Sequence, residues 1–348
     1  TAFARDLLAG YDRARRDLPW RRAPNAYRTL VSELMLQQTV VATVVPYFER
    51  FVARFPHIEA LAAAREDEVL SLWAGLGYYR RARHLHQTAR LVSERMQGVL
   101  PSQEEELRRL PGIGEYTAAA LAAIAFGQPT LPVDGNVARV LARLAGERAT
   151  VDLPSTRARL RDSGRLLVPR DRPGDFAQAM MELGALRCTP RAPACAACPV
   201  PRFCQARALS ATGLIPARAR RASRLRLTLV AVAVQRRGRL LLQQRPATGL
   251  LAKTWALPLH DLDGRPPVQV ARAVLSELGL RLEGAPISAG EIRHVFTHRD
   301  ATVHVMCARA RGRVARPDAR WTHRHELDAL PLSSFGRKMI GKALRSPA

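Results

Sequence analysis

The apolar residues of this chain change their spacing near residue 225, and this change constrains the fold more than any other feature. Up to residue 204 they recur at helical intervals, as in DEVLSLWAGLGYY and TAAALAAIAF, with prolines and glycines between the segments. Later they alternate, as in RLRLTLVAVAV and ATVHVMCARA, which is typical of strands. The sequence therefore predicts a multidomain protein, with an all-α domain over residues 1–204 and a smaller α+β domain over residues 225–348.

The segment between the two predicted domains, residues 205–224, is basic and poor in apolar residues, as expected of a linker. After it, RLRLTLVAVAV and RLLLQQR flank the turn QRRG and predict a hairpin, and PVQVARAVLSELGL predicts a helix that ends at Gly279. The sequence has no apolar run typical of a membrane span and no secretory signal. We therefore expect an intracellular, cytoplasmic protein, and a monomer because no segment resembles an oligomerisation helix.

The net charge is the largest compositional signal. The chain has 55 Lys and Arg against 30 Asp and Glu, a formal charge of +25. An excess of this size favours a polyanionic partner, most simply nucleic acid. Only three of the basic residues are lysines, a bias that a GC-rich genome would also produce. Genome composition does not explain the shortage of acidic residues, so a nucleic-acid partner is the preferred interpretation.

Glu33 is the one charged residue between Thr29 and Phe48, in the run TLVSELMLQQTVVATVVPYF. On a helix, Glu33 and Gln37 share a face and Gln38 lies beside it. A glutamate usually lies on a solvated face, which is the simpler interpretation. Its neighbours here are apolar, however, and desolvation raises the pKa of a carboxyl group so that it stays protonated near neutral pH. That is the property of a general acid.

Two further motifs each allow two interpretations. In LPGIGEYTAAALAAIAF, Gly112 and Gly114 permit a tight turn, and the helix that follows presents free N–H groups and its positive dipole end, which suit a phosphate. The alternative is a helical corner without a ligand. In LPVDGNVARVLARL, Asp134 precedes a helical repeat by two residues. It is an expected helix N-cap and also a candidate catalytic carboxylate.

Four of the five cysteines fall within 17 residues, spaced Cys188-x6-Cys195-x2-Cys198-x5-Cys204, and Cys307 stands alone. In an intracellular protein such a cluster indicates a metal site rather than disulfides. Four thiolates bind either zinc or an iron–sulfur cluster, and the spacing does not choose between them. Four unrelated buried thiols are the remaining alternative.

Taken in order, LPGIG, VDGNVARVL and the cysteine run resemble the endonuclease III superfamily of DNA glycosylases, the helix–hairpin–helix enzymes with a 4Fe–4S cluster. LPWR, SELMLQQT, GLGYYRRARHLH and QAMMELGALRC resemble its MutY-type adenine glycosylases. The likeness is most specific over residues 5–204 and extends to about residue 340 through LLLQQRPATGLLAKTWALP and HVFTH. It implies a hairpin at about residues 107–118, an iron–sulfur loop at residues 188–204, and a C-terminal Nudix-like domain.

MutY-type enzymes remove adenine mispaired with 8-oxoguanine in double-stranded DNA, after flipping the base out of the duplex. The resemblance implies that Glu33 protonates N7 of adenine and later activates water, and that Asp134 stabilises the oxocarbenium ion, two carboxylate roles that parallel retaining glycosidases. Bifunctional relatives have a nucleophilic Lys where this chain has Tyr116. A tyrosine cannot form a Schiff base, so a monofunctional hydrolase is expected.

The resemblance also assigns the remaining site residues. Asn136 lines the pocket together with Tyr116. The adenine is expected to contact Trp20, Arg21 and Gln178. The residues that wedge into the duplex beside 8-oxoguanine are expected to be Gln37, Gln38 and Tyr78. The family reads 8-oxoguanine with a Phe-Ser-His loop, and here the matching residues are Phe296, Thr297 and His298. The 4Fe–4S cluster is expected on Cys188, Cys195, Cys198 and Cys204.

Two departures from the family pattern stand in the second domain. Within GRPPVQVARAVLSELGL, three acids of the catalytic Nudix box are replaced by Val270, Ala273 and Ser276. Too few carboxylates remain for catalytic Mg²⁺, so loss of Nudix hydrolysis is expected. Lys253 occupies a position in GLLAKTW that is usually Gly in the family.

Three other functions remain as alternatives to an adenine glycosylase. The first is a thymine-mismatch glycosylase, which would lack the Nudix-like half. The others are a Nudix hydrolase with a DNA-binding half and a DNA-binding scaffold without activity.

Overall fold

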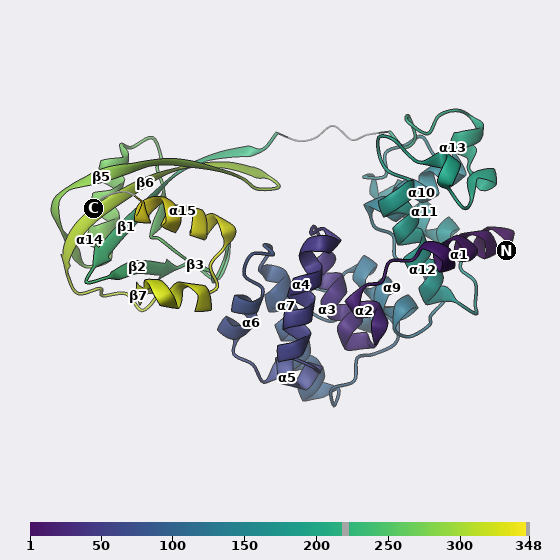
Figure 1. Ribbon diagram of the computed structural model, residues 1–348, viewed down its shortest axis with the longest axis horizontal. Helices are drawn as coiled ribbons and strands as arrows, with labels where there is room; N and C mark the ends of the chain where they lie inside the picture. Colours follow the sequence, from purple (N-terminus) through teal and green to yellow (C-terminus); the bar gives the residue numbers. More distant parts are fainter. Residues whose placement is uncertain (218–222, 346–348) are drawn as a thin grey trace. The chain divides into compact units, whose positions relative to one another are not determined.

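The computed structural model describes residues 1–217 and 223–345 (Figure 1). Contacts divide the chain into two compact units. The first, here called the helical unit, comprises Thr1–Ala63 and His84–Arg221. The second, here called the C-terminal unit, comprises Ala64–Arg83 and Ala222–Ala348. Within the described residues, no helix combines the length and apolar content needed to cross a bilayer.

Short α-helices build the helical unit, as the spacing of apolar residues predicts. Their bounds are α1 (Ala2–Ala14), α2 (Pro19–Arg22), α3 (Ala26–Leu36), α4 (Val41–Arg54), α5 (Ile58–Ala62), α7 (Arg80–Arg95), α8 (Glu104–Leu107), α9 (Glu115–Ile124), α10 (Gly135–Ala145), α11 (Pro154–Arg165), α12 (Pro173–Glu182) and α13 (Gln205–Ala208). A π-helical turn, Leu183–Arg187, continues α12, and 3₁₀ turns occupy Cys195–Ala197 and Pro201–Phe203.

One apolar core joins the two ends of this unit. Phe3 of α1 packs edge-on against Phe176 of α12 and against Phe203 of the cysteine loop, with ring centroids 6.1 and 5.6 Å apart. Val137 of α10 and Leu183 lie in the same buried cluster. The core therefore holds α1, α10 and α12 together with the loop that carries the cysteines, and α10 begins directly after Asp134.

The hairpin predicted at about residues 107–118 connects α8 to α9. Gly112 has φ +74°, and a Cβ there would come within 2.4 Å of the Cβ of His84, so this turn requires glycine. Gly114 is the N-cap of α9 and provides no side-chain acceptor. The first N–H groups of α9 therefore remain available to another acceptor, as a phosphate site needs.

A seven-stranded mixed sheet forms the centre of the C-terminal unit. Its central path is β3-β2-β1-β6-β5, β4 pairs with β1, and β7 pairs with β2. Strands β1 and β6 run parallel, and the other pairs are antiparallel. The strands are β1 (Leu225–Arg236), β2 (Arg239–Gln244), β3 (Trp255–Ala256), β4 (Leu259–Asp261), β5 (Leu280–Val295), β6 (Arg299–Gly312) and β7 (Ala319–His323).

Both faces of this sheet are covered by helices (Figure 1). Along β1, Ala231 and its alternate neighbours pack with α15 (Ser334–Leu344), whereas Val232 and its alternate neighbours pack with α14 (Pro267–Glu277). This is the expected consequence of side chains that alternate between the faces of a strand. It confirms the predicted α+β class, the first hairpin and the helix before Gly279.

Residues 64–83, which the sequence places in the helical domain, belong to the C-terminal unit. Ser71 of α6 (Glu66–Leu72) donates a hydrogen bond to the carbonyl of Ala329 at 2.8 Å. Arg83 donates to the carbonyl of Ala247 at 2.8 Å. These bonds join segments more than a hundred residues apart, so local sequence does not predict them.

The linker predicted over residues 205–224 is in part packed. Helix α13 begins it, and Ala206, Ala211 and Ile215 are buried in the core of the helical unit. The backbone N–H of Ala217 donates to the carbonyl of Arg148 at 3.1 Å. Residues 218–222 lie outside the described part of the chain. The small apolar side chains scattered through a basic segment explain why the sequence indicated a linker.

Candidate active site

Glu33 is buried in α3, with 4% of its surface exposed. The hydroxyl of Tyr116, in the first turn of α9, donates a hydrogen bond to its Oε2 at 2.9 Å. Burial raises the pKa of Glu33 to about 7, and the neighbouring Asp134 also raises it. The hydrogen bond from Tyr116 and the charge of Arg21 oppose this shift. A carboxyl with this pKa exchanges its proton near neutral pH, as general acid–base catalysis requires.

Asp134 is the N-cap of α10, which confirms the simpler interpretation of its position. Its Oδ1 accepts hydrogen bonds from the backbone N–H groups of Asn136 and Val137 at 2.9 and 2.7 Å. Its Oδ2 accepts from the side-chain amide of Asn136 at 2.9 Å. These three bonds hold the carboxylate in one orientation. The capping role does not remove it from the pocket, because Asp134 and Asn136 both line the cavity described next.

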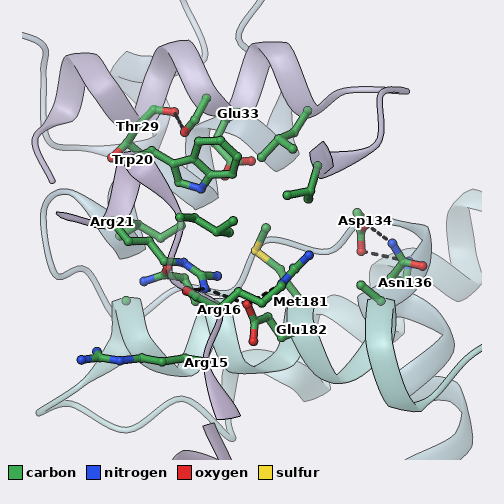
Figure 2. Close-up of a pocket in the computed structure, with 18 of the residues that line it drawn as sticks. Arg15, Arg16, Trp20, Arg21, Thr29, Glu33, Asp134, Asn136, Met181 and Glu182 are labelled. Atoms are coloured by element: carbon green, nitrogen blue, oxygen red, sulfur yellow. Dashed lines mark hydrogen bonds and ion pairs between the residues drawn. The ribbon is translucent and has the colours of Figure 1, made fainter. Parts of the chain in front are cut away.

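A cavity of about 750 Å³ contains both carboxylates. This volume is typical of a site for a small molecule or an extruded group. Figure 2 shows Glu33 on α3 and Asp134 with Asn136 at the start of α10. The cavity brings together seven residues that the sequence analysis selected, which are Trp20, Arg21, Glu33, Tyr116, Asp134, Asn136 and Gln178.

A further carboxylate group in the cavity, that of Glu182, was missed by the sequence analysis. Glu182, at the end of α12, is largely buried and accepts hydrogen bonds from Arg21 at 2.7 Å and from Arg16 at 3.0 Å. Figure 2 shows the three side chains close together. Glu182 orients Arg21, whose charge lowers the pKa of Glu33. An acidic residue in the apolar run QAMMELGAL was a signal of the same kind as Glu33.

Two arginines of α10 connect the cavity to the cysteine loop. Arg139 donates to the side-chain oxygen of Asn136 at 3.0 Å, to the carbonyl of Gly184 at 2.7 Å and to the carbonyl of Cys188 at 2.8 Å. Gly184 also approaches α10 closely, because a Cβ there would come within 2.9 Å of the Cβ of Asn136. Arg143, 1% exposed, donates to the Sγ of Cys188 at 3.2 Å.

The four clustered cysteines line one small cavity, which places the predicted ligands together. Burial raises the pKa of the Cys198 and Cys204 thiols, and the neighbouring cysteines raise it further. In the described part of the chain, no three His, Cys, Asp or Glu side chains converge closely enough to bind one metal ion. The four thiols thus lie around one cavity.

The predicted duplex-wedging glutamines follow α3 and lie outside the 750 Å³ cavity. The side-chain amide of Gln37 donates to the hydroxyl of Thr117 at 3.1 Å. Gln38 is exposed and adopts φ +59° in the turn after α3. Gln37 therefore forms a hydrogen bond with α9, whereas the side chain of Gln38 is exposed after the turn.

In the C-terminal unit, two residues predicted to lie beside 8-oxoguanine meet. The hydroxyl of Tyr78 forms a hydrogen bond with the hydroxyl of Thr297. Tyr78 is 44% exposed and has φ +49°. The ring of Phe296 lies edge-on to His294, with centroids 4.5 Å apart. Residues 78 and 296–298 thus belong to one surface, although more than two hundred positions separate them in sequence.

We expect Tyr116→Phe to raise the pKa of Glu33 above 7. The tyrosine hydroxyl donates to the carboxylate and thereby stabilises its charged form, whereas phenylalanine keeps the ring that excludes water. The carboxyl infrared band followed against pH measures this, with Glu33→Gln as the variant that identifies the band. A pKa that falls toward 4.5 would mean that access of water to the cavity, and not the hydrogen bond, dominates the effect of the substitution.

Comparisons with known proteins agree with this geometry. Residues 31–165 match the HhH-GPD superfamily of base excision DNA repair proteins, and residues 229–342 match the NUDIX domain. The chain is 37% identical to the adenine DNA glycosylase of Homo sapiens over 404 residues, which cover 98% of this chain and 73% of that protein. It is 44% identical to the adenine DNA glycosylase of Mycolicibacterium smegmatis over 196 residues, 56% of this chain and 66% of that protein.

Among solved structures, a thermostable thymine-DNA glycosylase is similar at 28% identity with a TM-score of 0.55, over 60% of this chain and 96% of that one. A non-covalent endonuclease III–DNA complex matches at 22% identity with a TM-score of 0.51, over 60% of this chain and 94% of that one, and supports the fold alone. The sequence relationship extends through both units. The chain belongs to the adenine DNA glycosylases of the HhH-GPD superfamily.

Proposed function

We propose that this adenine DNA glycosylase removes adenine mispaired with 8-oxoguanine or guanine, by hydrolysis of the N-glycosidic bond without strand cleavage. The observation that carries the proposal is the buried Glu33, with a pKa of about 7, in a cavity that also contains a second carboxylate, Asp134. One carboxyl that exchanges its proton near neutral pH and one that is fixed by hydrogen bonds suit two different roles.

Glu33 acts first as the acid. A flipped adenine in the cavity is protonated at N7, which makes the base a better leaving group before the bond from C1′ to N9 breaks. Tyr116 holds the carboxyl through its hydroxyl and leaves the other carboxyl oxygen for the base. The carboxylate that remains then accepts a proton from the attacking water. Burial keeps bulk water away from Glu33 and maintains its high pKa.

Asp134 stabilises the positive charge that grows on the sugar as the base leaves. Asn136 and the first N–H groups of α10 orient its two oxygens, so little reorganisation is needed when the charge develops. The position of Tyr116 supports the monofunctional assignment, because a phenol next to Glu33 supplies no amine for a Schiff base. Trp20, Arg21 and Gln178 line the same cavity and are proposed to contact the adenine.

The C-terminal unit is proposed to recognise 8-oxoguanine in the opposite strand. The support is the contact between Tyr78 and Thr297, which brings a duplex-wedging residue to the loop formed by residues 296–298. Thr297 keeps the hydroxyl of the serine in the family loop and is proposed to hydrogen-bond the base with it. Gln37, Gln38 and the N-terminus of α9 after Gly112 and Gly114 are proposed to contact the duplex itself.

The cysteine loop is proposed to hold a 4Fe–4S cluster. In a zinc site four sulfurs surround a single ion at about 2.3 Å, whereas each thiolate of a cluster binds its own iron. Cys188, Cys195, Cys198 and Cys204 line one small cavity, so all four thiolates are available to one group. The resemblance of their spacing to that of the cluster-bearing DNA glycosylases supports the 4Fe–4S cluster over zinc. Bound there, the cluster would keep the loop folded against α10, with Arg143 donating to Cys188.

A single-turnover excision assay tests the proposed function. The chain is expected to release adenine from duplexes with A·8-oxoguanine and A·G, and to leave strand breaks only after alkali. Glu33→Gln keeps the size of the side chain but removes the proton, and loss of a general acid typically costs about 10²–10⁴-fold in rate. Release is measured by denaturing electrophoresis of end-labelled DNA.

The same assay includes T·G and C·8-oxoguanine duplexes, because a thymine-DNA glycosylase is among the similar structures. Release of thymine from T·G, or full activity of Glu33→Gln, would contradict the proposal. A matched control is Glu94→Gln, an exposed glutamate on α7, which is expected to leave the excision rate unchanged.

The excision rate is expected to fall as pH rises through about 7. Only protonated Glu33 donates to the base, and its protonated fraction decreases about tenfold per pH unit above its pKa. This fall is measured by single-turnover rates at saturating enzyme between pH 5.5 and 9, a range that extends about two units to either side of the pKa of Glu33. A rate independent of pH across this range would exclude Glu33 as the acid in the rate-limiting step.

Purified protein is expected to contain about four iron and four sulfide per chain. Chemical analysis and the visible absorption spectrum measure both, and Cys198→Ser is expected to lower them. Cys307→Ser is the control, because this cysteine is buried in the C-terminal unit. About one zinc per chain and no iron would contradict the cluster.

A further inference from the structure

A cationic groove lies in the C-terminal unit between β5 and α15. It has a volume of about 600 Å³ and is lined by Ile292, Arg293, Ser334, Arg337, Lys338, Gly341 and Arg345. Four of these seven residues carry positive charge and none is acidic. We call this feature the β5–α15 groove. Neither the candidate active site nor the loop at residues 296–298 includes any of its seven residues.

The positive charge of the groove is largely uncompensated. Arg337 forms an ion pair with Asp328 at 2.7 Å. In the described part of the chain, no ion pair is seen for Arg293, Lys338 or Arg345. Lys342 adds a further charge beside β5, since a Cβ on Gly290 would lie 3.1 Å from its Nζ. Like charges that line one groove repel each other, and an anion bound there would relieve this repulsion.

The spacing of the cations fits an extended anion rather than a point charge. Residues 337, 338, 341 and 345 fall on one face of α15, and glycine at position 341 leaves room between the charged side chains. From Arg337 to Arg345 the helix rises about 12 Å at 1.5 Å per residue. One DNA strand carries a phosphate for about every 3.4 Å of helix axis. Measured along the axis of a duplex, the length of this row of charges corresponds to about three to four phosphates of one strand.

The groove begins at the loop proposed to read 8-oxoguanine. His294, near the end of β5, and Phe296, just after it, both contact the ring of Phe335 in the first turn of α15, with ring centroids 5.0 and 5.2 Å apart. Burial and the neighbouring Lys338 lower the pKa of His294, which favours its neutral form. His294, Phe296 and Phe335 together form an aromatic cluster. Beyond this cluster, the positively charged residues of the groove follow Phe335 along α15.

We propose that the β5–α15 groove binds the phosphates of the DNA strand that flank the nucleotide contacted by residues 296–298. Phosphates on one side of that nucleotide follow the cations of α15, while the base faces Thr297. The groove supplies affinity that does not depend on sequence, and the loop supplies the choice of base. The inference rests on the proposed function only for the identity of the base, since any DNA backbone satisfies the charges.

The test is the salt dependence of DNA binding by the full-length protein. The double variant Lys338→Gln/Arg345→Gln is compared with wild type by fluorescence anisotropy, on duplexes with A·8-oxoguanine and on fully paired duplexes. Each lost phosphate contact lowers the slope of log affinity against log salt by about 0.9. We expect a loss of about 1.8 in this slope on both duplexes, because the variant removes two phosphate contacts.

The matched control is Arg272→Gln/Arg281→Gln, which removes the same charge from the same unit. Both residues are exposed, and Arg272 belongs to α14, which packs on the opposite face of the sheet. An unchanged slope in the groove variant would overturn the proposal, and so would an equal loss in the control. If the wild type excises no adenine but the groove variant still loses more salt dependence than the control variant, the proposed function is wrong and the proposed phosphate binding by the groove is supported.

Discussion

The burial of one carboxyl group sets the requirements for the rest of the helical unit. Taking Glu33 out of water is unfavourable for its charged form, and the apolar face of α3 that surrounds it can only raise its pKa. A proton donor whose pKa rose far above neutral would never release its proton. Tyr116 and Arg21 counter the shift, Asp134 adds to it, and the balance lies at about 7. Three separate elements, α2, α9 and α10, must therefore meet at α3.

Much of this site was predictable because its signals are local. Glu33 stands out as the one charge in an apolar helix, Asp134 as an N-cap before a helical repeat, and the cysteines by their spacing. Glu182 was missed because its meaning depends on Arg16 and Arg21, more than 160 positions away. Local sequence contains no information on such a pairing. The contact between Tyr78 and Thr297 was out of reach for the same reason.

The backbone conformation of Lys253 in the C-terminal unit gives one departure from the family pattern a physical interpretation. The resemblance matches Lys253 with a position that is expected to be glycine in the family, and in the structure Lys253 adopts φ +65°. This is the left-handed region, in which glycine is strained least. The backbone conformation thus gives a physical reason for the glycine that the resemblance leads one to expect. A lysine there carries a conformational cost, of order 1 kcal/mol, that glycine avoids.

Helix α10 connects the chemistry to the cysteine loop. Its N-terminus is capped by Asp134 in the cavity, and its buried arginines bind carbonyls of the loop and the turn before it. A buried guanidinium without a carboxylate partner is stable only when its donors are satisfied. Arg139 and Arg143 meet this need with the carbonyls of Gly184, Cys188 and Thr189. Any change in the loop must therefore leave these donors unpaired or move α10, and with it Asp134.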